Sequence, residues 1–258
     1  MPQTVAIIQA RMTSTRLPGK VLQQINQRPM LSYMVERVKR AKLIDDVVIA
    51  TSTGISDNSI EEFCHTHNCL CFRGNLDDVL DRYFQAAVQV GCKTVVRLTS
   101  DCPVIDPEII DSVVLTFNSG GYDYCANTAP PEGSTFPDGM DVEVFSFAAL
   151  EKAWKEATKP SDREHVTFYF WHNPDKFKTY RYDLPENLSS YRLTVDYPAD
   201  FEVIKSILSS LYPVNPKFTM QEVIDFLNQN KEVLLINSTI VRNQGWLSAF
   251  EKDKKAGF

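Results

Sequence analysis

Apolar and polar positions follow two different periods along the first half of the chain. Short apolar runs bounded by polar or turn residues predict buried strands over residues 5–8, 46–51, 69–72 and 94–98. The stretches that follow them carry apolar residues on one helical face and predict helices over residues 30–42, 56–65, 76–90 and 107–117, the second of them capped at Ser56. Strands separated by helices of this length pair in parallel through right-handed crossovers. The pattern therefore predicts an α/β fold with a mostly parallel sheet flanked by helices.

The second half of the chain has a more mixed pattern. It predicts strands over residues 122–126, 140–145 and 180–182, and helices over residues 147–157, 163–171, 201–211 and 219–228. Residues 127–138 are rich in proline and form a loop long enough to be functional. Residues 251–258 are charged, and we expect them to be frayed. We interpret residues 1–215 as one α/β domain with a smaller mixed α+β subregion at about 122–185, and residues 216–258 as a helical extension packed on it.

The composition is that of an ordinary globular enzyme and narrows the classes of partner. The chain has 258 residues, 43% of them hydrophobic and 23% charged, with a formal net charge of -6. No run of Lys or Arg forms a long basic stripe, so we expect no nucleic-acid partner, because such binding depends chiefly on neutralising phosphates. A small anionic ligand held by a few local cations is compatible with this charge.

The N-terminal sequence predicts neither secretion nor a membrane span. No basic segment precedes a long apolar stretch there, as a signal peptide would require. No window approaches about 18 uninterrupted apolar residues, the usual minimum for a membrane-spanning helix. We therefore expect a cytoplasmic protein.

The six cysteines include a cluster over residues 64–71 that also contains His65 and His67. In a chain of this size without a signal peptide, free thiols are the default. The cluster resembles a zinc site, but its spacing fits none of the paired patterns that converge on a tetrahedral ion. The favoured interpretation is the end of a helix, a turn, and a strand with Cys69 and Cys71 on one face.

The most informative segment is QARMTSTRLPGKVL, residues 9–22, directly after the first strand. In open α/β sheets, ligands bind beyond the carboxyl ends of the strands. The segment carries three cations, Arg11, Arg16 and Lys20, among small residues whose backbone N–H groups can face an anion. Guanidinium groups, an ammonium and backbone amides together suit a triphosphate. The alternative is a solvated basic turn that binds nothing.

Two common phosphate-binding motifs do not account for this segment. A Walker loop needs Gly five residues before the second Gly and Ser or Thr after the Lys, and these positions hold Ser14 and Val21. A dinucleotide-binding motif needs a glycine pattern directly after the first strand, but the first glycine of the chain is Gly19.

The run from Ala10 to Lys20 instead resembles the nucleotide-binding signature of the cytidylyltransferases that activate 3-deoxy-manno-octulosonate, which are related to the acylneuraminate cytidylyltransferases. The whole chain resembles more closely the cytidylyltransferase-like family named after the spore coat polysaccharide biosynthesis protein SpsF. The matching blocks span residues 5 to about 205 and are ARMTSTRLPGKVL, VVIATS, FRGNLDDVLDRY, VVRLTSDCPVIDPEIID, PDGMDVEVFSFAALEKAW, REHVTFYF and RLTVDYPADFEVI. The first and fourth blocks are specific, and the others support them.

The resemblance implies a Rossmann-like nucleotidyltransferase sheet whose smaller subregion serves acceptor binding and dimerisation. It also implies a homodimer, formed through the second half of the chain. The implied reaction is the Mg²⁺-dependent transfer of CMP from CTP to a sugar or sugar-acid acceptor, with release of pyrophosphate, in surface polysaccharide biosynthesis. The nucleotide would be bound by Ala10, Arg11, Ser14, Arg16, Gly19 and Lys20.

The resemblance further implies that Asp101 and Asp196 hold the metal, because an aspartate occupies each place in the related enzymes. Asp101 directly follows the fourth strand, so its carboxylate should face the same crevice as the loop. We read Asp196 as the end of a strand that runs into a helix, where it could instead cap that helix before Pro198. Asp200 fits a first-turn acid that matches the helix dipole. In catalysis, Arg11, Lys20 and Asp101 would be the residues that act on the phosphates.

The base and the acceptor have weaker candidates. Thr51 and Arg73 follow the second and third strands and could read the base, together with Asp78, which could equally pair with Arg82 on the next turn of its helix. The acceptor candidates are Asp138, Asp141 and Glu143, which suit sugar hydroxyls, and Arg163 and His165, of which the Arg suits a carboxylate. His165 could also be a satisfied helix histidine. The acceptor motifs of the octulosonate enzymes are absent, so the sugar stays open.

Two other functions compete with nucleotidyl transfer. A glycosyltransferase that uses a nucleotide-sugar donor shares the α/β layout, but its metal is often held by an Asp-x-Asp pair, and the segment Ser100-Asp101-Cys102-Pro103 has no second acid. Three loop cations also suit a triphosphate better than a diphosphate ester. A catalytically silent nucleotide-binding module would not need both Asp101 and Asp196. These features favour the nucleotidyltransferase.

Overall fold

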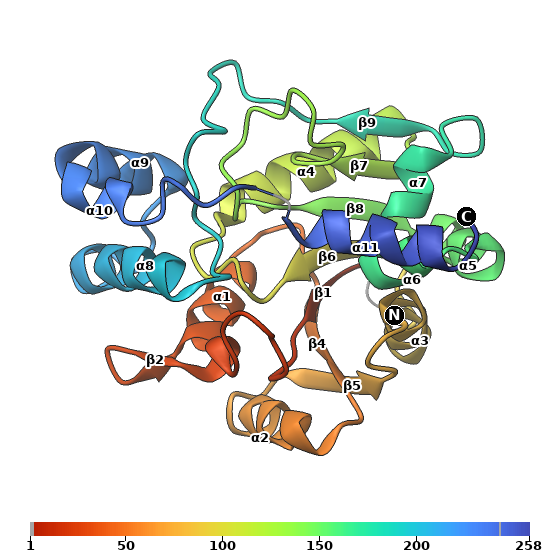
Figure 1. Ribbon diagram of the computed structural model, residues 1–258, viewed down its shortest axis with the longest axis horizontal. Helices are drawn as coiled ribbons and strands as arrows, with labels where there is room; N and C mark the ends of the chain where they lie inside the picture. The colour runs from red at the N-terminus through yellow and green to blue at the C-terminus, as the bar shows by residue number, and fades with distance from the viewer. Residues whose placement is uncertain (1–2, 243) are drawn as a thin grey trace.

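A seven-stranded sheet organises the fold (Figure 1), and the computed structural model describes residues 3–242 and 244–258. The strands are β1 (Thr4–Gln9), β4 (Asp46–Ser52), β5 (Leu70–Gly74), β6 (Thr94–Thr99), β7 (Tyr124–Ala126), β8 (Glu143–Ser146) and β9 (Thr179–Arg181). Their order across the sheet is β5-β4-β1-β6-β8-β7-β9. β8 is antiparallel to both β6 and β7, and every other pairing in this sheet is parallel. The expected mostly parallel α/β fold is confirmed.

Helices cover both faces of the sheet, because successive strand residues point to opposite sides. In β1, Ala6 and Ile8 belong to one buried cluster, and Val5 and Ile7 belong to the other. The first cluster is covered by α1 (Met30–Val38), α2 (Asn58–Thr66), α4 (Pro107–Gly120), α8 (Pro198–Leu211) and α9 (Met220–Gln229). The second is covered by α3 (Val79–Val90), α5 (Phe147–Glu156) and α7 (Phe168–His172). Two apolar layers therefore hold the sheet between helices.

The remaining elements are short, and several boundaries differ from the expectation. They are η1 (Lys20–Leu22), the two-stranded sheet of β2 (Gln24–Ile25) and β3 (Arg28–Pro29), η2 (Ile55–Asp57), α6 (Pro160–His165), α10 (Lys231–Leu235) and α11 (Gln244–Lys255). The small β2–β3 sheet was not predicted. The α-helix expected to begin at Ser56 begins at Asn58, after η2, and no side chain caps it.

The single helix predicted over residues 163–171 is wrong. The chain forms two short helices there, α6 and α7, and the break falls at Val166, whose φ is 60°. A positive φ lies outside the right-handed helical region, so the helical hydrogen bonds cannot continue through this residue, and sequence periodicity does not reveal such a break. The break turns α6 away from α7 and leaves His165 at the junction.

The expectation of a frayed segment over residues 251–258 is also wrong, because α11 continues to Lys255. Asp253 is buried, and its carboxylate accepts hydrogen bonds from the backbone N–H (2.8 Å) and the hydroxyl (2.5 Å) of Ser161 in α6. α11 consequently runs along α6 across the front of the molecule in Figure 1. The proposed division of the chain at residue 215 stays a prediction.

The cysteine-rich segment has the local structure expected from the simpler interpretation. Cys64 lies in α2 and Cys71 lies in β5, but Cys69 precedes that strand, which begins at Leu70. All six thiols are free. Within residues 3–242 and 244–258, no group of three or more His, Cys, Asp or Glu side chains is arranged to hold a metal ion. None of the helices over the same residues is long and apolar enough to cross a membrane.

Candidate active site

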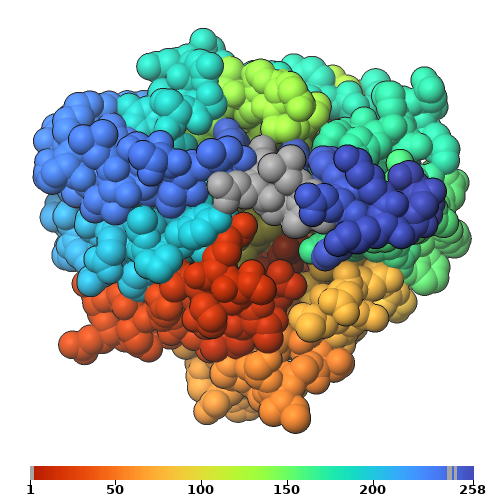
Figure 2. Space-filling model, in the orientation of Figure 1, coloured from red at the N-terminus to blue at the C-terminus, as the bar shows by residue number. Residues whose placement is uncertain are grey.

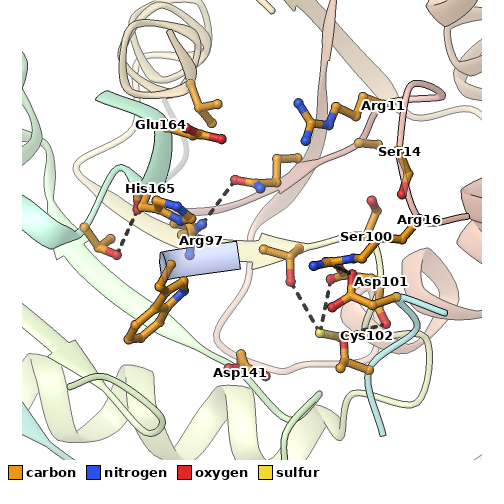
Figure 3. Close-up of a pocket in the computed structure, with 18 of the residues that line it drawn as sticks. Arg11, Ser14, Arg16, Arg97, Ser100, Asp101, Cys102, Asp141, Glu164 and His165 are labelled. Carbon is orange, nitrogen blue, oxygen red and sulfur yellow. Dashed lines mark hydrogen bonds and ion pairs between the residues drawn. The ribbon is translucent and has the colours of Figure 1, made fainter. Parts of the chain in front are cut away.

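A cleft of about 730 Å³ opens at the carboxyl ends of β1 and β6. Figure 2 shows the recess between the N-terminal segment in red, the amber segment that includes α3, and the dark blue C-terminal helix. In Figure 3, Arg11, Ser14, Arg16 and Asp101 lie on one side of the cleft, and Arg97, Glu164 and His165 lie on the other. We refer to these two sides as the loop side and the helix side.

The loop after β1 is held by backbone hydrogen bonds at both ends. The Ala10 N–H donates to the Ala50 carbonyl in β4 (3.1 Å), and the Gly19 N–H donates to the Met12 carbonyl (2.9 Å). Gly19 has a φ of 69°, a conformation that favours glycine, and an added Cβ would lie 3.3 Å from the Met12 side chain. Arg11 lines the cleft and has no ion pair or hydrogen bond from its side chain to any residue that the structure describes. Its guanidinium is therefore available to an anion.

Lys20 lies between the two aspartates predicted to hold a metal. Its ammonium is 3.1 Å from Asp101 Oδ2 and 3.0 Å from Asp196 Oδ1, and it also donates to the Val195 carbonyl (2.5 Å). Burial lowers the pKa of Lys20, but Asp101 and Asp196 outweigh burial and raise the pKa above its ordinary value. Burial raises the pKa of Asp101, but Lys20 and hydrogen bonds lower it below the ordinary value. The ammonium and this carboxylate therefore stay charged at neutral pH.

Arg16 joins the same cluster from the exposed side of the loop. Its guanidinium is 2.6 Å from Asp196 Oδ1 and lies over the Tyr197 ring. Asp196 thus faces two cations of the loop, and it does not cap α8, whose N-cap residue is Tyr197. The loop and the segment before α8, far apart in sequence, meet at these charges.

The segment before α8 reaches Asp101 in a way that was not predicted. Residues 193–195 belong to no strand of the seven-stranded sheet, so the expectation that Asp196 ends a strand is wrong. The segment is held instead by the Val195 N–H, which donates to the Asp101 carbonyl (2.8 Å), and by a single bridge between Asp138 and Arg192. Asp200 accepts the backbone N–H groups of Asp196 (3.0 Å) and Tyr197 (2.9 Å), as a first-turn acid should.

The base-binding candidates do not line the cleft. Thr51 is fully buried, and Arg73 donates to the carbonyls of Ser52 (2.9 Å) and Gly54 (2.9 Å) and pairs with Glu61. The Thr51 and Arg73 side chains are therefore absent from the cleft wall.

Asp78 also has a structural role, although not the one expected. Its carboxylate caps α3 by accepting the Asp81 N–H (2.9 Å) and pairs with Arg163 (2.5 Å). Arg82 is buried and donates to the Asn75 carbonyl (2.9 Å), so the alternative in which Asp78 pairs with Arg82 is wrong. The helix break before α7 brings Arg163 to Asp78, and neither residue lines the cleft.

The other acceptor candidates do meet in the cleft. Asp138, Asp141, Glu143 and His165 all line it. Glu143 is occupied by Arg97, with which it forms a buried ion pair, and by the Tyr124 hydroxyl (2.5 Å). Sequence reasoning missed Arg97, because it lies inside a strand that reads as apolar.

The titrations of Asp138 and His165 differ from those of solvated side chains. Asp138 accepts from Arg192 (2.6 Å), yet burial and the neighbouring Asp141 raise the pKa of Asp138 to about 7. Burial lowers the pKa of His165 to about 4, so its imidazole is neutral at neutral pH. The cleft wall therefore carries less net charge than its residue types indicate.

A family model described as cytidylyltransferase matches residues 5–240, nearly the whole chain. The chain belongs to the cytidylyltransferase family. This membership confirms the expected class of enzyme, a CTP-dependent nucleotidyltransferase, and it decides against the glycosyltransferase that the sequence left open.

Two curated relatives and one solved structure resemble this cytidylyltransferase along most of its length. The spore coat polysaccharide biosynthesis protein SpsF of Bacillus subtilis is 32% identical over 90% of this chain and 97% of its own. A 3-deoxy-manno-octulosonate cytidylyltransferase of Chloroherpeton thalassium is 30% identical over 67% of this chain and 75% of its own. The structure of a cytidylyltransferase from Leptospira borgpetersenii is 35% identical, with a TM-score of 0.85 over 93% of this chain and 99% of its own. The expected resemblance to the SpsF-like family is confirmed.

The family match ends at residue 240, yet later residues of this cytidylyltransferase contribute to the cleft. Val241, Trp246 and Lys252 line the cleft. The Trp246 ring lies 4.9 Å from that of Phe168 and 5.8 Å from that of Trp171, and Lys252 pairs with Glu164 (2.7 Å). Sequence reasoning missed these residues because it treated the C-terminal segment as a packed extension.

Proposed function

We propose that this cytidylyltransferase transfers CMP from CTP to a sugar or sugar-acid acceptor, requires Mg²⁺ and releases pyrophosphate. The observation that carries the proposal is the charge cluster on the loop side, where Lys20 bridges Asp101 and Asp196 beneath a loop that carries Arg11. The names of the two relatives, one for spore coat polysaccharide biosynthesis and one for 3-deoxy-manno-octulosonate, support a sugar-like acceptor and a role in surface polysaccharide biosynthesis.

The residues present fit a magnesium ion. Mg²⁺ takes hard oxygen ligands and is usually bound through one or two carboxylates together with substrate phosphates and water. Asp101 and Asp196 supply two carboxylates that both contact one ammonium, so a small cation is within reach of both. When bound, the ion would neutralise the triphosphate and hold its oxygens in line.

The loop residues would bind the triphosphate and stabilise the charge that develops on it. Arg11, the unpaired cation, would form paired hydrogen bonds to phosphate oxygens, and Arg16 and Ser14 line the path beside it. An acceptor hydroxyl oxygen would form a bond to the α-phosphorus and lose its proton to water, and the bond from that phosphorus to the bridging oxygen would break, so that pyrophosphate leaves. Lys20 and Arg11 would offset the negative charge on the transferring group. Catalysis would then consist mainly of positioning and electrostatic stabilisation.

The acceptor would lie against the helix side. Asp141 lines the cleft, its carboxylate accepts the Gly139 N–H (2.7 Å), and no ion pair within the described chain engages it, so it can also accept from sugar hydroxyls. Trp171 and Trp246 offer aromatic surface to the apolar face of a sugar ring. Arg163, in contrast, does not line the cleft, and it would affect acceptor binding only by joining α6 to Asp78 at the start of α3. A homodimer formed through the second half of the chain stays a prediction, which sedimentation would test.

The proposal is tested first by ligand-induced stabilisation. The protein is heated with CTP, UTP, GTP, ATP, CMP or a nucleotide sugar, each with and without Mg²⁺. A ligand at about 100 times its dissociation constant stabilises the folded state by about 2.7 kcal/mol, or several degrees. We expect a Mg²⁺-dependent shift with CTP that Lys20→Ala abolishes, followed by pyrophosphate release with sugar acceptors. A shift with a nucleotide sugar and none with any triphosphate would refute the proposal.

A further inference from the structure

Asp57 is a fully buried carboxylate that no part of the proposed reaction uses. It ends η2, immediately before α2, and it is absent from the cleft wall. Its Oδ1 accepts the Met12 N–H (2.8 Å), and its Oδ2 accepts the Ser52 N–H (3.2 Å) and the Ser52 hydroxyl (2.5 Å). A buried charge is costly unless it is satisfied, so three donors gathered around one carboxylate indicate a specific role.

Capping of α2 does not explain this arrangement. Asp57 occupies the N-cap position of α2, but its side chain accepts no hydrogen bond from that helix. It forms no ion pair with any residue in the described part of the chain. Both of its oxygens are directed away from the helix, one to the loop after β1 and the other to the end of β4.

Met12 connects Asp57 to the loop after β1, which is the phosphate-binding loop of the proposed function and is called the phosphate loop below. The Met12 N–H binds Asp57, and the Met12 carbonyl accepts the N–H of Gly19, the residue before Lys20. One residue thereby joins both ends of the loop over residues 12–19. Arg11 lies between Met12 and Ala10, which is itself bound to the Ala50 carbonyl. The backbone on both sides of the free guanidinium is thus fixed to β4.

We propose that Asp57 is a positioning residue for the nucleotide triphosphate, acting through Met12 to hold the phosphate loop in its binding conformation. The inference rests on the proposed function, in which this loop binds CTP. A loop that is already ordered loses less conformational freedom when the ligand binds. The hydrogen bonds that join Asp57 to Met12 and Ser52, which we call the Asp57 clamp, therefore increase affinity without contacting the ligand. Without the hydrogen bond between Asp57 and Met12, the side chains of Arg11, Ser14 and Arg16 are still present, but the loop no longer holds them in the arrangement that binds the triphosphate.

The substitution Asp57→Asn tests the Asp57 clamp, because the side chain keeps almost the same shape but loses one acceptor oxygen. An amide has one acceptor oxygen and one NH₂ donor, so it cannot accept from both Met12 and Ser52. One of the two connections must then become a contact between two donors. We expect the dissociation constant for CTP, measured by calorimetry with Mg²⁺ present, to rise about tenfold, the effect of losing one hydrogen bond to a charged group.

Asp106→Asn is the matched control. Asp106 is also a buried aspartate whose carboxylate joins two segments, because it accepts the N–H groups of Glu108 (2.9 Å) and Met220 (2.6 Å), and it lies outside the cleft wall. We expect both variants to be destabilised towards urea and only Asp57→Asn to bind CTP more weakly. Affinity is compared at a temperature where both variants are folded, so a merely structural role would not separate them.

Ser52→Ala is the second variant, for the case in which Asp57→Asn does not fold. It removes the Ser52 hydroxyl donor to Asp57 and also the acceptor for the Gly54 N–H (3.1 Å), and we expect a rise of about threefold in the dissociation constant for CTP. Unchanged CTP affinity in Asp57→Asn, or in Ser52→Ala if that variant alone folds, would overturn the positioning role. Failure of the unaltered protein to bind CTP would instead overturn the proposed function on which the inference rests.

Discussion

The loop side and the helix side of the cleft differ in whether their charged side chains are available to a ligand. On the loop side, Arg11 has no partner in the described chain, and Lys20 and Arg16 gather around Asp101 and Asp196. On the helix side, two cations that line the cleft are already paired, Arg97 with Glu143 and Lys252 with Glu164. His165 is neutral there, because burial lowers its pKa to about 4. A polyanion is therefore favoured on the first side, and a ligand recognised by shape and hydroxyl groups is favoured on the second.

The two sides also differ in how their residues are assembled. The loop side uses segments within the family match: the loop after β1, the end of β6 and the segment before α8, which lies outside the sheet. The helix side uses α6, α7 and α11, which are joined through Ser161, Asp253 and a group of aromatic rings. Part of it lies beyond residue 240, where the family match ends.

The largest expected effect is on the loop side, from Asp101→Asn. The variant keeps its shape but loses the charge that pairs with Lys20 and that the proposed Mg²⁺ would require, so we expect at least about 99% of turnover to be lost, as when one preorganised charge stabiliser is removed. Pyrophosphate release measures the effect. Asp111→Asn is the control, because Asp111 accepts backbone N–H groups of Lys42 (3.0 Å) and Leu43 (2.9 Å) outside the cleft wall. Near-normal turnover in Asp101→Asn would remove Asp101 from the mechanism.

A smaller effect is expected on the helix side, from Trp246→Ala. Loss of this ring removes aromatic surface from the acceptor, so we expect the KM for the acceptor to rise about tenfold while CTP affinity is unchanged. The acceptor is the sugar that gives most pyrophosphate release with the unaltered protein.

Trp154→Ala is the matched control for Trp246→Ala. The Trp154 ring stacks on Phe84 (4.2 Å), and its Nε1 donates to Asp81 (2.8 Å), away from the cleft wall. The contrast between the two sides would fail if Trp246→Ala weakened CTP binding and left the acceptor KM unchanged.

The smallest effect concerns the stability of the helix side and its dependence on pH. The pKa of His165 is lowered from 6.5 to about 4 by burial, so the unfolded chain binds a proton between these values before the folded chain does. The stability contributed by the neutral ring is present above the unfolded pKa and is lost as pH falls towards about 4.

His165→Phe keeps a ring beside Phe168 but cannot titrate. Between about pH 7 and pH 5.5, we expect the unaltered protein to lose about 1 kcal/mol more stability than His165→Phe. Urea unfolding at the two pH values measures the difference. An equal loss in both proteins would show that His165 does not titrate as a buried ring.

The sequence predicted correctly those features that depend on short segments of the chain. The strand before the loop, the three cations and the position of Asp101 after β6 all follow from short segments, because the carboxyl ends of parallel strands share one edge. Prediction from sequence was wrong where a distant partner decides the role of a residue. Asp78 pairs with Arg163 rather than Arg82, and Asp196 reaches Lys20 from outside the sheet.

The sequence by itself determined the sheet, its crevice and the loop with its cations, since hydrophobic period and motif spacing are local properties of the chain. Only the tertiary structure decided which charges are free and which are paired, because pairing depends on residues brought together from distant segments. It also decided that α11 belongs to the cleft, through the buried Asp253 carboxylate that two donors of Ser161 satisfy. The charged C-terminal segment is expected from its sequence to be solvent-exposed, because the partner of Asp253, Ser161, lies 92 residues away in the chain.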